Sequence, residues 1–160
     1  MKKIILHSIV LASLVALFII GFGGKSAQAD TTDSTDSSTT YSSIYKVAKS
    51  KLGSSYSWGA VGPNRFDCSG FTSYVYKKGI GKTISRTAQA QYNKYTHVSY
   101  SNIKKGDLVF FGYSKSSISH VGLYVGDGKM IDAQNRGVVK EAVKAPWWHA
   151  VGYARVTTLS

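Results

Sequence analysis

The chain has 160 residues, a net charge of +12 and a single cysteine, Cys68. One cysteine excludes a disulfide scaffold, and the dispersed histidines argue against a metal cluster of the usual ligand spacing. The basic balance favours anionic partners such as wall polymers or lipid head groups, although a merely soluble basic surface would carry the same charge. Nucleic acid is disfavoured because the lysines are scattered and form no basic helix or stripe.

Residues 1–29 have the pattern of an export signal. Lys2 and Lys3 precede a nearly all-apolar stretch, Ile4 to Phe22, and Ala27-Gln28-Ala29 fits the small-x-small cleavage pattern. The apolar stretch approaches membrane-spanning length, so a retained N-terminal anchor is the alternative. In either case the rest of the chain is expected to lie outside the membrane.

Residues 30–40 contain only Asp, Ser and Thr, which predicts a disordered linker because no apolar side chain is available for burial. The remaining segment, residues 41–160, has the size of one domain with a single core.

Three helices are predicted in the first half of this domain. The first has apolar residues at helical spacing, Ser42 or Ser43 as its N-cap and Gly53 at its end. The second is expected from about Cys68 to Gly79, and the third from Thr87, which caps it, to Tyr92.

The pattern changes to that of strands after residue 105. Short apolar or alternating stretches predict strands at residues 107–111, 120–125, 130–133 and 151–156. Helices followed by strands predict an α+β domain with an antiparallel sheet.

Cys68 is either an inert buried side chain or a nucleophile. Its predicted position at a helix N-terminus would favour the thiolate and would offer backbone N–H groups to an oxyanion. A nearby Gly70 would allow another segment to approach this turn closely. The surroundings therefore favour the nucleophile.

His120 is the best candidate for the imidazole that a catalytic thiol needs. It enters a predicted strand on the face opposite the apolar residues, and Gly122 is expected to leave open space beside it. His97 lies among polar loop residues, and His149 could be a packed or surface histidine.

The hairpin after His120 brings Asp132 into consideration. A three-residue loop at 126–128 would pair Gly122 with Asp132 and make Asp132 a same-face diagonal neighbour of His120. A two-residue loop would instead turn Asp132 to the opposite face. This register predicts a line from Cys68 through His120 to Asp132, in which the carboxylate orients the ring. An ordinary acid near a turn is the alternative.

Four ordered motifs resemble the NlpC-type family of bacterial cell-wall cysteine peptidases, and the resemblance covers almost all of residues 41–156. They are Tyr56-Ser57-Trp58-Gly59, Phe66-Asp67-Cys68-Ser69-Gly70-Phe71, Gly106-Asp107-Leu108-Val109-Phe110-Phe111 and His120-Val121-Gly122-Leu123-Tyr124-Val125-Gly126. The resemblance implies a minimal papain-like fold, with the cysteine on a helix and the histidine on an antiparallel sheet. It also implies hydrolysis of amide bonds in peptidoglycan stem peptides, commonly between D-glutamate and the diamino acid.

The resemblance also implies roles for individual residues. Cys68 matches the nucleophile, His120 the general base and Tyr56 a tyrosine near the oxyanion. The residues that match substrate contacts or the border of the groove are Asp67, Ser69, Arg86 and Thr87. The third catalytic position is usually histidine in the family, whereas here it is Asp132, and Gln134 is the reserve candidate for orienting His120.

We therefore expect a secreted, monomeric peptidoglycan hydrolase that needs no metal or cofactor and binds stem peptides and anionic wall polymers. An amidase that cuts between sugar and peptide, or a transacylase, could use the same thiol and imidazole. A non-catalytic wall-binding module is a further alternative, since the basic surface and Trp58, Trp147 and Trp148 could hold glycan or peptide. The aromatic-rich segment 146–153 is expected to form core and groove wall.

Overall fold

The computed structural model describes residues 35–159, with side chains from residue 41 onward. The predicted export signal and the first residues of the predicted linker lie outside the described residues. Within the described range, no helix combines the length and apolar character needed to cross a membrane.

The first helix, α1 (Thr35–Ser50), is longer at its start and shorter at its end than predicted. It begins before Ser42, so the second half of the Asp, Ser and Thr segment is helical. That segment contains no Gly or Pro that would prevent a helix from extending backwards from the apolar turns. Ile44 and Ala48 are fully buried, whereas Leu52 lies beyond the helix and is 41% exposed.

The second helix, α2 (Cys68–Ile80), begins at the predicted residue, and α3 (Ala88–Lys94) is capped by Thr87 as predicted. The predicted stop at Gly79 is wrong, because Gly81 ends α2 in the left-handed conformation with φ 71°. Gly79 has a different role. A Cβ atom there would lie 2.9 Å from Cα of Ile44, so the glycine permits close packing of α2 on α1.

The sheet has six antiparallel strands in the order β3-β8-β4-β5-β6-β7. Four of them confirm the prediction: β4 (Leu108–Ser114), β5 (Ser117–Gly126), β6 (Lys129–Gln134) and β8 (Ala150–Arg155). The prediction missed the sheet edges, β3 (Thr96–Val98) and β7 (Gly137–Ala142). Two further short strands, β1 (Ser55–Tyr56) and β2 (Arg65–Phe66), form a separate parallel pair.

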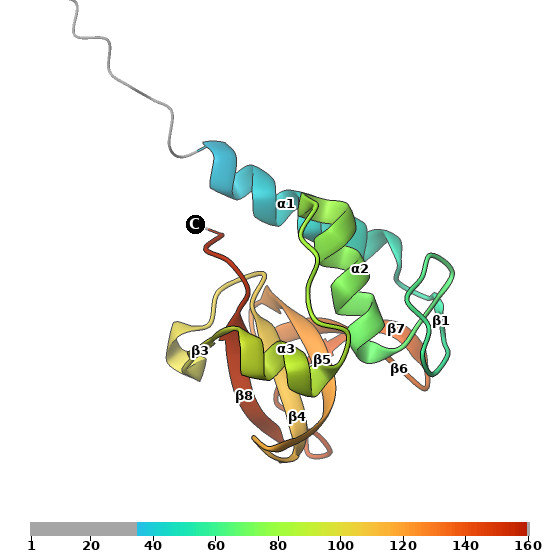
Figure 1. The fold of residues 1–160 in the computed structure, drawn as a ribbon, viewed down its shortest axis with the longest axis vertical. Helices are drawn as coiled ribbons and strands as arrows, with labels where there is room; N and C mark the ends of the chain where they lie inside the picture. Colours follow the sequence, from blue (N-terminus) through green and yellow to red (C-terminus); the bar gives the residue numbers. More distant parts are fainter. Residues whose placement is uncertain (1–34, 160) are drawn as a thin grey trace, which may run out of the picture. The chain divides into compact units, whose positions relative to one another are not determined.

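The helices cover one face of the sheet (Figure 1), where α2 packs on β5 and β6 and α3 packs on β5 and β8. The main core lies between these layers and includes Ile44, Phe71, Val75, Leu108 and Leu123, all fully buried. A smaller cluster contains Val109, Phe111 and Met130 at the alternate strand positions, together with Val143 just after β7. The expected alternation of β5 is confirmed, since Val121 and Leu123 belong to the main core.

The hairpin between β5 and β6 differs from the predicted one but has the predicted register. Its loop is a two-residue turn, Asp127-Gly128, with both residues at positive φ. A bulge between Tyr124 and Gly126 adds one residue to β5, so Leu123 still pairs with Ile131 and Tyr124 with Met130. A two-residue loop alone would turn Asp132 to the sheet face opposite His120, and the extra residue in the bulge keeps the two on the same face.

Candidate active site

Cys68 is the first residue of α2, directly after the N-cap residue Asp67. The Asp67 side chain accepts a hydrogen bond from the Gly70 backbone N–H at 2.6 Å, which fixes the first turn of the helix. The predicted close approach at Gly70 is present, since a Cβ atom there would lie 2.1 Å from the Ala60 carbonyl oxygen. Only glycine fits at this position.

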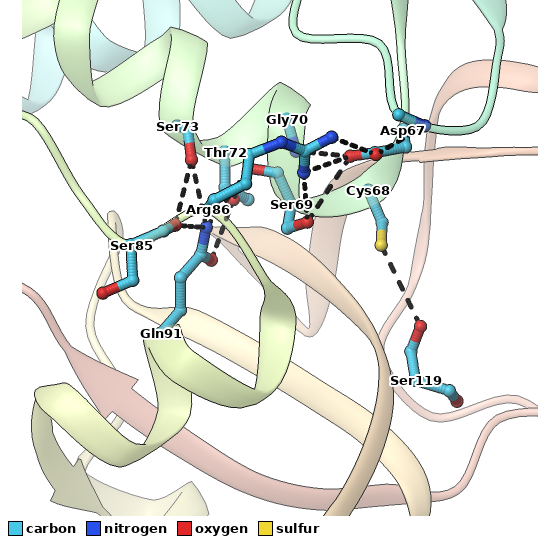
Figure 2. A network of polar contacts seen from close by, with 11 residues as sticks. Asp67, Cys68, Ser69, Gly70, Thr72, Ser73, Ser85, Arg86, Gln91 and Ser119 are labelled. Atoms are coloured by element: carbon cyan, nitrogen blue, oxygen red, sulfur yellow. Dashed lines mark hydrogen bonds and ion pairs between the residues drawn. The ribbon is translucent and has the colours of Figure 1, made fainter.

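The thiol faces the sheet from the end of the helix, as Figure 2 shows. Cys68 is 8% exposed, and its sulfur lies 4.0 Å from the carbonyl oxygen of Ser119 on β5. Because Ser119 directly precedes His120, this contact brings the thiol to the start of the predicted histidine strand. Because Cys68 is the first residue of α2, the partial positive charge of the helix N-terminus also acts on its sulfur.

His120 and Asp132 form a buried pair on neighbouring strands. Nε2 of His120 lies 2.8 Å from Oδ2 of Asp132, and their side chains are 14% and 0% exposed. The predicted proximity of these two residues is therefore present. Since Nε2 is taken by Asp132, Nδ1 is the ring nitrogen left to face Cys68.

The structure corrects the expected open space beside His120. A Cβ atom on Gly122 would lie 2.8 Å from Sδ of Met130 and 3.2 Å from Cβ of Asp132. The space is thus filled by side chains of β6. The glycine allows β6 to bring Asp132 close to the histidine.

The pKa of His120 is raised to about 9. Burial of the ring acts in the opposite direction, but hydrogen bonds and charge attraction from Asp132 and Cys68 outweigh it. The ring is therefore an imidazolium at neutral pH. That charge state suits a partner for a thiolate.

Two aromatic residues enclose the imidazole, and the sequence patterns assigned neither to the site. Trp148 stacks on His120 with ring centroids 4.8 Å apart and planes at 15°, and Phe111 lies 5.8 Å away. The indole N–H of Trp148 donates a 3.0 Å hydrogen bond to Oε1 of Glu141 on β7. The nearest sequence signals were the expectation that residues 146–153 form core and groove wall and the position of Phe111 at the end of the third motif.

Gln134, the reserve candidate for orienting His120, is engaged elsewhere. Its side-chain amide donates to Oε1 of Glu141, and its carbonyl oxygen accepts from Arg136 at 3.4 Å. The carboxylate that is hydrogen-bonded to the imidazole is therefore that of Asp132.

Tyr56 lies on β1, half-buried, at the approach to the thiol. Burial raises the pKa of its hydroxyl, and the nearby charges of Cys68 and Asp67 raise it further. The phenol therefore stays protonated and can donate a hydrogen bond near the sulfur.

Asp67, Ser69 and Arg86 form a second polar cluster at the start of α2 (Figure 2). Nη1 of Arg86 donates to Oδ1 of Asp67 at 3.1 Å and to Oγ of Ser69 at 3.0 Å, while Nη2 lies 2.5 Å from Oδ2 of Asp67. The backbone N–H of Gly59 also donates to Oδ2. Asp67 and Ser69 are buried, and the Arg86 side chain, 43% exposed, is the outermost member of the cluster.

Thr87 follows Arg86 and is exposed, with its hydroxyl accepting a 3.2 Å hydrogen bond from the Ala90 backbone N–H.

The other two described histidines make their contacts outside this site. His97 stacks on Tyr92 and bonds to its carbonyl oxygen, and His149 is exposed. Across residues 35–159, no group of three His, Cys, Asp or Glu side chains is arranged to hold a metal ion.

Comparison with known proteins places the chain in a family. The sequence pattern of the NlpC/P60 family matches residues 53–156. The chain is 47% identical over 125 residues to the probable endopeptidase p60 of Listeria grayi, covering 77% of this chain and 24% of that protein. It is 37% identical over 121 residues to the bifunctional muramidase/DL-endopeptidase CwlT of Bacillus subtilis, covering 72% and 36%.

The fold agrees with these sequence matches. The crystal structure of the NlpC/p60 domain of the peptidoglycan hydrolase SagA superposes with a TM-score of 0.66 at 34% identity, covering 72% of this chain and 98% of that one. The chain therefore belongs to the NlpC/P60 family, and the resemblance inferred from its motifs is confirmed. It spans only about a quarter of the length of the p60 protein and about a third of CwlT.

Proposed function

We propose that this domain hydrolyses amide bonds in peptidoglycan stem peptides through a thiol acyl-enzyme. The observation that carries the proposal is the placement of Cys68 at a helix N-terminus beside an imidazolium that Asp132 holds. The p60, CwlT and SagA relatives, named as an endopeptidase, a DL-endopeptidase and a peptidoglycan hydrolase, support the substrate class. Within that class, the bond between D-glutamate and the diamino acid is the proposed target.

In the proposed reaction, the Cys68 thiolate attacks the carbonyl carbon of the scissile amide. Backbone N–H groups at the start of α2 and the Tyr56 hydroxyl stabilise the resulting oxyanion. His120 transfers its proton to the leaving amine, and a thioester remains on Cys68. The neutral imidazole then takes a proton from water, which attacks the thioester and releases the peptide acid and the thiolate.

We propose that the substrate also contacts four polar residues at the starts of α2 and α3, near Cys68. They are Asp67, Ser69, Arg86 and Thr87. Because Asp67 and Ser69 are buried beneath Arg86, a peptide would meet the guanidinium first. This assignment rests on the family resemblance and on the position of the cluster next to Cys68.

The deciding experiment is digestion of purified cell walls of known chemistry, followed by mass spectrometry of the new termini. We expect new peptide ends within the stem peptide, complete loss of release with Cys68→Ala, and normal release with the control variant His97→Ala. Undiminished release by the Cys68→Ala protein would refute the proposal. New ends between sugar and peptide would indicate an amidase, and cross-linked products would indicate a transacylase.

We also propose that the domain is exported, acts as a monomer and associates with the wall through its basic charge. The export signal predicted at residues 1–29 supports export, and the charge left after its three lysines are removed, 12 − 3 = +9, supports association with anionic wall polymers. The mature N-terminus of protein recovered from culture medium should begin at Asp30. A retained N-terminus would indicate an anchor instead.

A further inference from the structure

Glu141 occupies an unusual place beside the candidate catalytic residues. It is the only glutamate in the chain, and its side chain is 13% exposed. Strand β7 places it on the same face as Val139, which pairs with Asp132 across the β6–β7 ladder. The carboxyl group therefore lies on the sheet face that also carries Asp132, one strand beyond it in the order β5-β6-β7.

One contact of Glu141 leads to His120 through Trp148. The indole N–H of Trp148 donates to Oε1 of Glu141 at 3.0 Å, and the same indole stacks on the imidazole. A stacked ring restricts the tilt of its neighbour only if its own orientation is fixed. The bond to Glu141 fixes it, because an indole has a single hydrogen-bond donor and this is its partner.

The other connection leads to His120 through Asp132. Oδ2 of Asp132 bonds the imidazole, but Oδ1 is buried and has no hydrogen-bond partner among the described residues. A buried carboxylate oxygen without a donor is costly, so a nearby donor is expected. A protonated Glu141 carboxyl group is such a donor.

We propose that Glu141 is a positioning residue for His120, which it holds through Trp148 on one side and through the free oxygen of Asp132 on the other. The charged groups that face Glu141 are Asp132 on β6 and Arg136 in the β6–β7 turn, whose Nη2 lies 2.8 Å from Oε2. Burial raises the pKa of Glu141, and the negative charge of Asp132 raises it further, while Trp148 and Arg136 oppose this. Two adjacent carboxyl groups that share a proton behave in this way.

The inference rests on the proposed hydrolase function for its activity readout, but its first test does not. Because Glu141 is the only glutamate, labelling the glutamate side-chain carboxyl carbon with ¹³C gives one resonance that reports its protonation. We expect its pKa to lie above that of an ordinary glutamate and to fall in the Asp132→Asn variant. An ordinary midpoint that Asp132→Asn leaves unchanged would overturn the shared proton.

The second test uses wall-digestion kinetics with Glu141→Gln, Glu141→Ala and the control Arg136→Gln. Glutamine keeps an oxygen for the Trp148 indole and gives an N–H to Asp132, so activity should remain within about threefold of wild type. Alanine removes both contacts and should lower kcat by about tenfold or more, with little change in KM, because the ring is misplaced while substrate binding is intact. Arg136, 61% exposed, should be dispensable.

The third test asks whether Glu141 acts through Trp148. Trp148→Phe retains a stacked ring but loses the indole N–H, so it should lower kcat, and adding Glu141→Ala should cost less than the product of the two single effects. Multiplicative losses in the double variant, or equal damage from Glu141→Gln and Glu141→Ala, would overturn the positioning role. Loss of wall digestion by every variant, wild type included, would instead contradict the proposed function.

Discussion

Two buried carboxylates flank the candidate active site, and they are held in opposite ways. Asp67, on the α2 side, accepts hydrogen bonds from the backbone N–H groups of Gly59 and Gly70 and binds Arg86 through both oxygens. Asp132, on the sheet side, is fully buried and bonds only His120, through one oxygen.

The difference indicates what each carboxylate does. Asp67 accepts hydrogen bonds from two backbone N–H groups and also from the side chains of Ser69 and Arg86, so it both caps the helix and positions Arg86. Asp132 is hydrogen-bonded to a single side chain, that of His120, and a fully buried carboxylate without a positively charged partner would be strongly unfavourable. His120, whose pKa is raised to about 9, supplies the positive charge that offsets this burial.

The largest expected effect comes from Asp132. Asp132→Ala should lower kcat for wall digestion by at least about 10²-fold, because the imidazole loses the acceptor that orients it. Asp132→Asn should cost far less, since the amide oxygen still accepts from Nε2. The matched control is Asp127→Asn in the exposed β5–β6 turn, which should leave activity unchanged. Equal losses from the alanine and asparagine variants would show that charge, not orientation, matters.

The second effect concerns pH. His120 must be protonated to give a proton to the leaving amine, so kcat/KM should fall as pH rises above about 9. Asp132→Asn removes a charge that raises the pKa of His120, so the fall should begin at lower pH. The histidine resonances in an NMR titration would check the assignment. An alkaline limit that Asp132→Asn does not move would contradict it.

The third effect separates fold from binding on the α2 side. Asp67→Ala removes the N-cap of α2 and should lower the free energy of unfolding by about 1–2 kcal/mol. Arg86→Gln should change stability by less than about 1 kcal/mol, because its ion pair is partly exposed. If Arg86 meets the substrate, this variant should instead raise KM. Urea unfolding and kinetics on the same samples would distinguish the two, and an unchanged KM would remove Arg86 from the binding site.

The parts of the site that follow from local patterns could be predicted from the sequence. The helix start at Cys68 and the alternation of β5 are encoded by neighbouring residues. The proximity of His120 and Asp132 was predicted from a three-residue loop, whereas the hairpin has a two-residue turn and a bulge. Both give the same register, because the face on which a residue lies depends on the total number of turn and bulge residues.

The parts that were missed depend on contacts between distant segments. Strand β7 has no clean alternation, since Lys140 and Glu141 follow two valines, and it exists through its pairing with β6. The space beside Gly122 was expected to be open because a single strand does not reveal that Met130 and Asp132 fill it. Stacking of Trp148 on His120 likewise requires the complete sheet.

Thr87 gives the smallest effect and extends the comparison to α3. Like Asp67 it caps a helix, but it is exposed, and its hydroxyl accepts a hydrogen bond from the Ala90 N–H. Thr87→Ala should therefore lower stability by about 1 kcal/mol and the melting temperature by about 4 °C, while Thr87→Ser retains both. If capping is its only role, KM should change less than twofold, because Arg86 remains bound to Asp67. A large rise in KM at unchanged melting temperature would mean that the hydroxyl contacts the substrate, as the family resemblance implies.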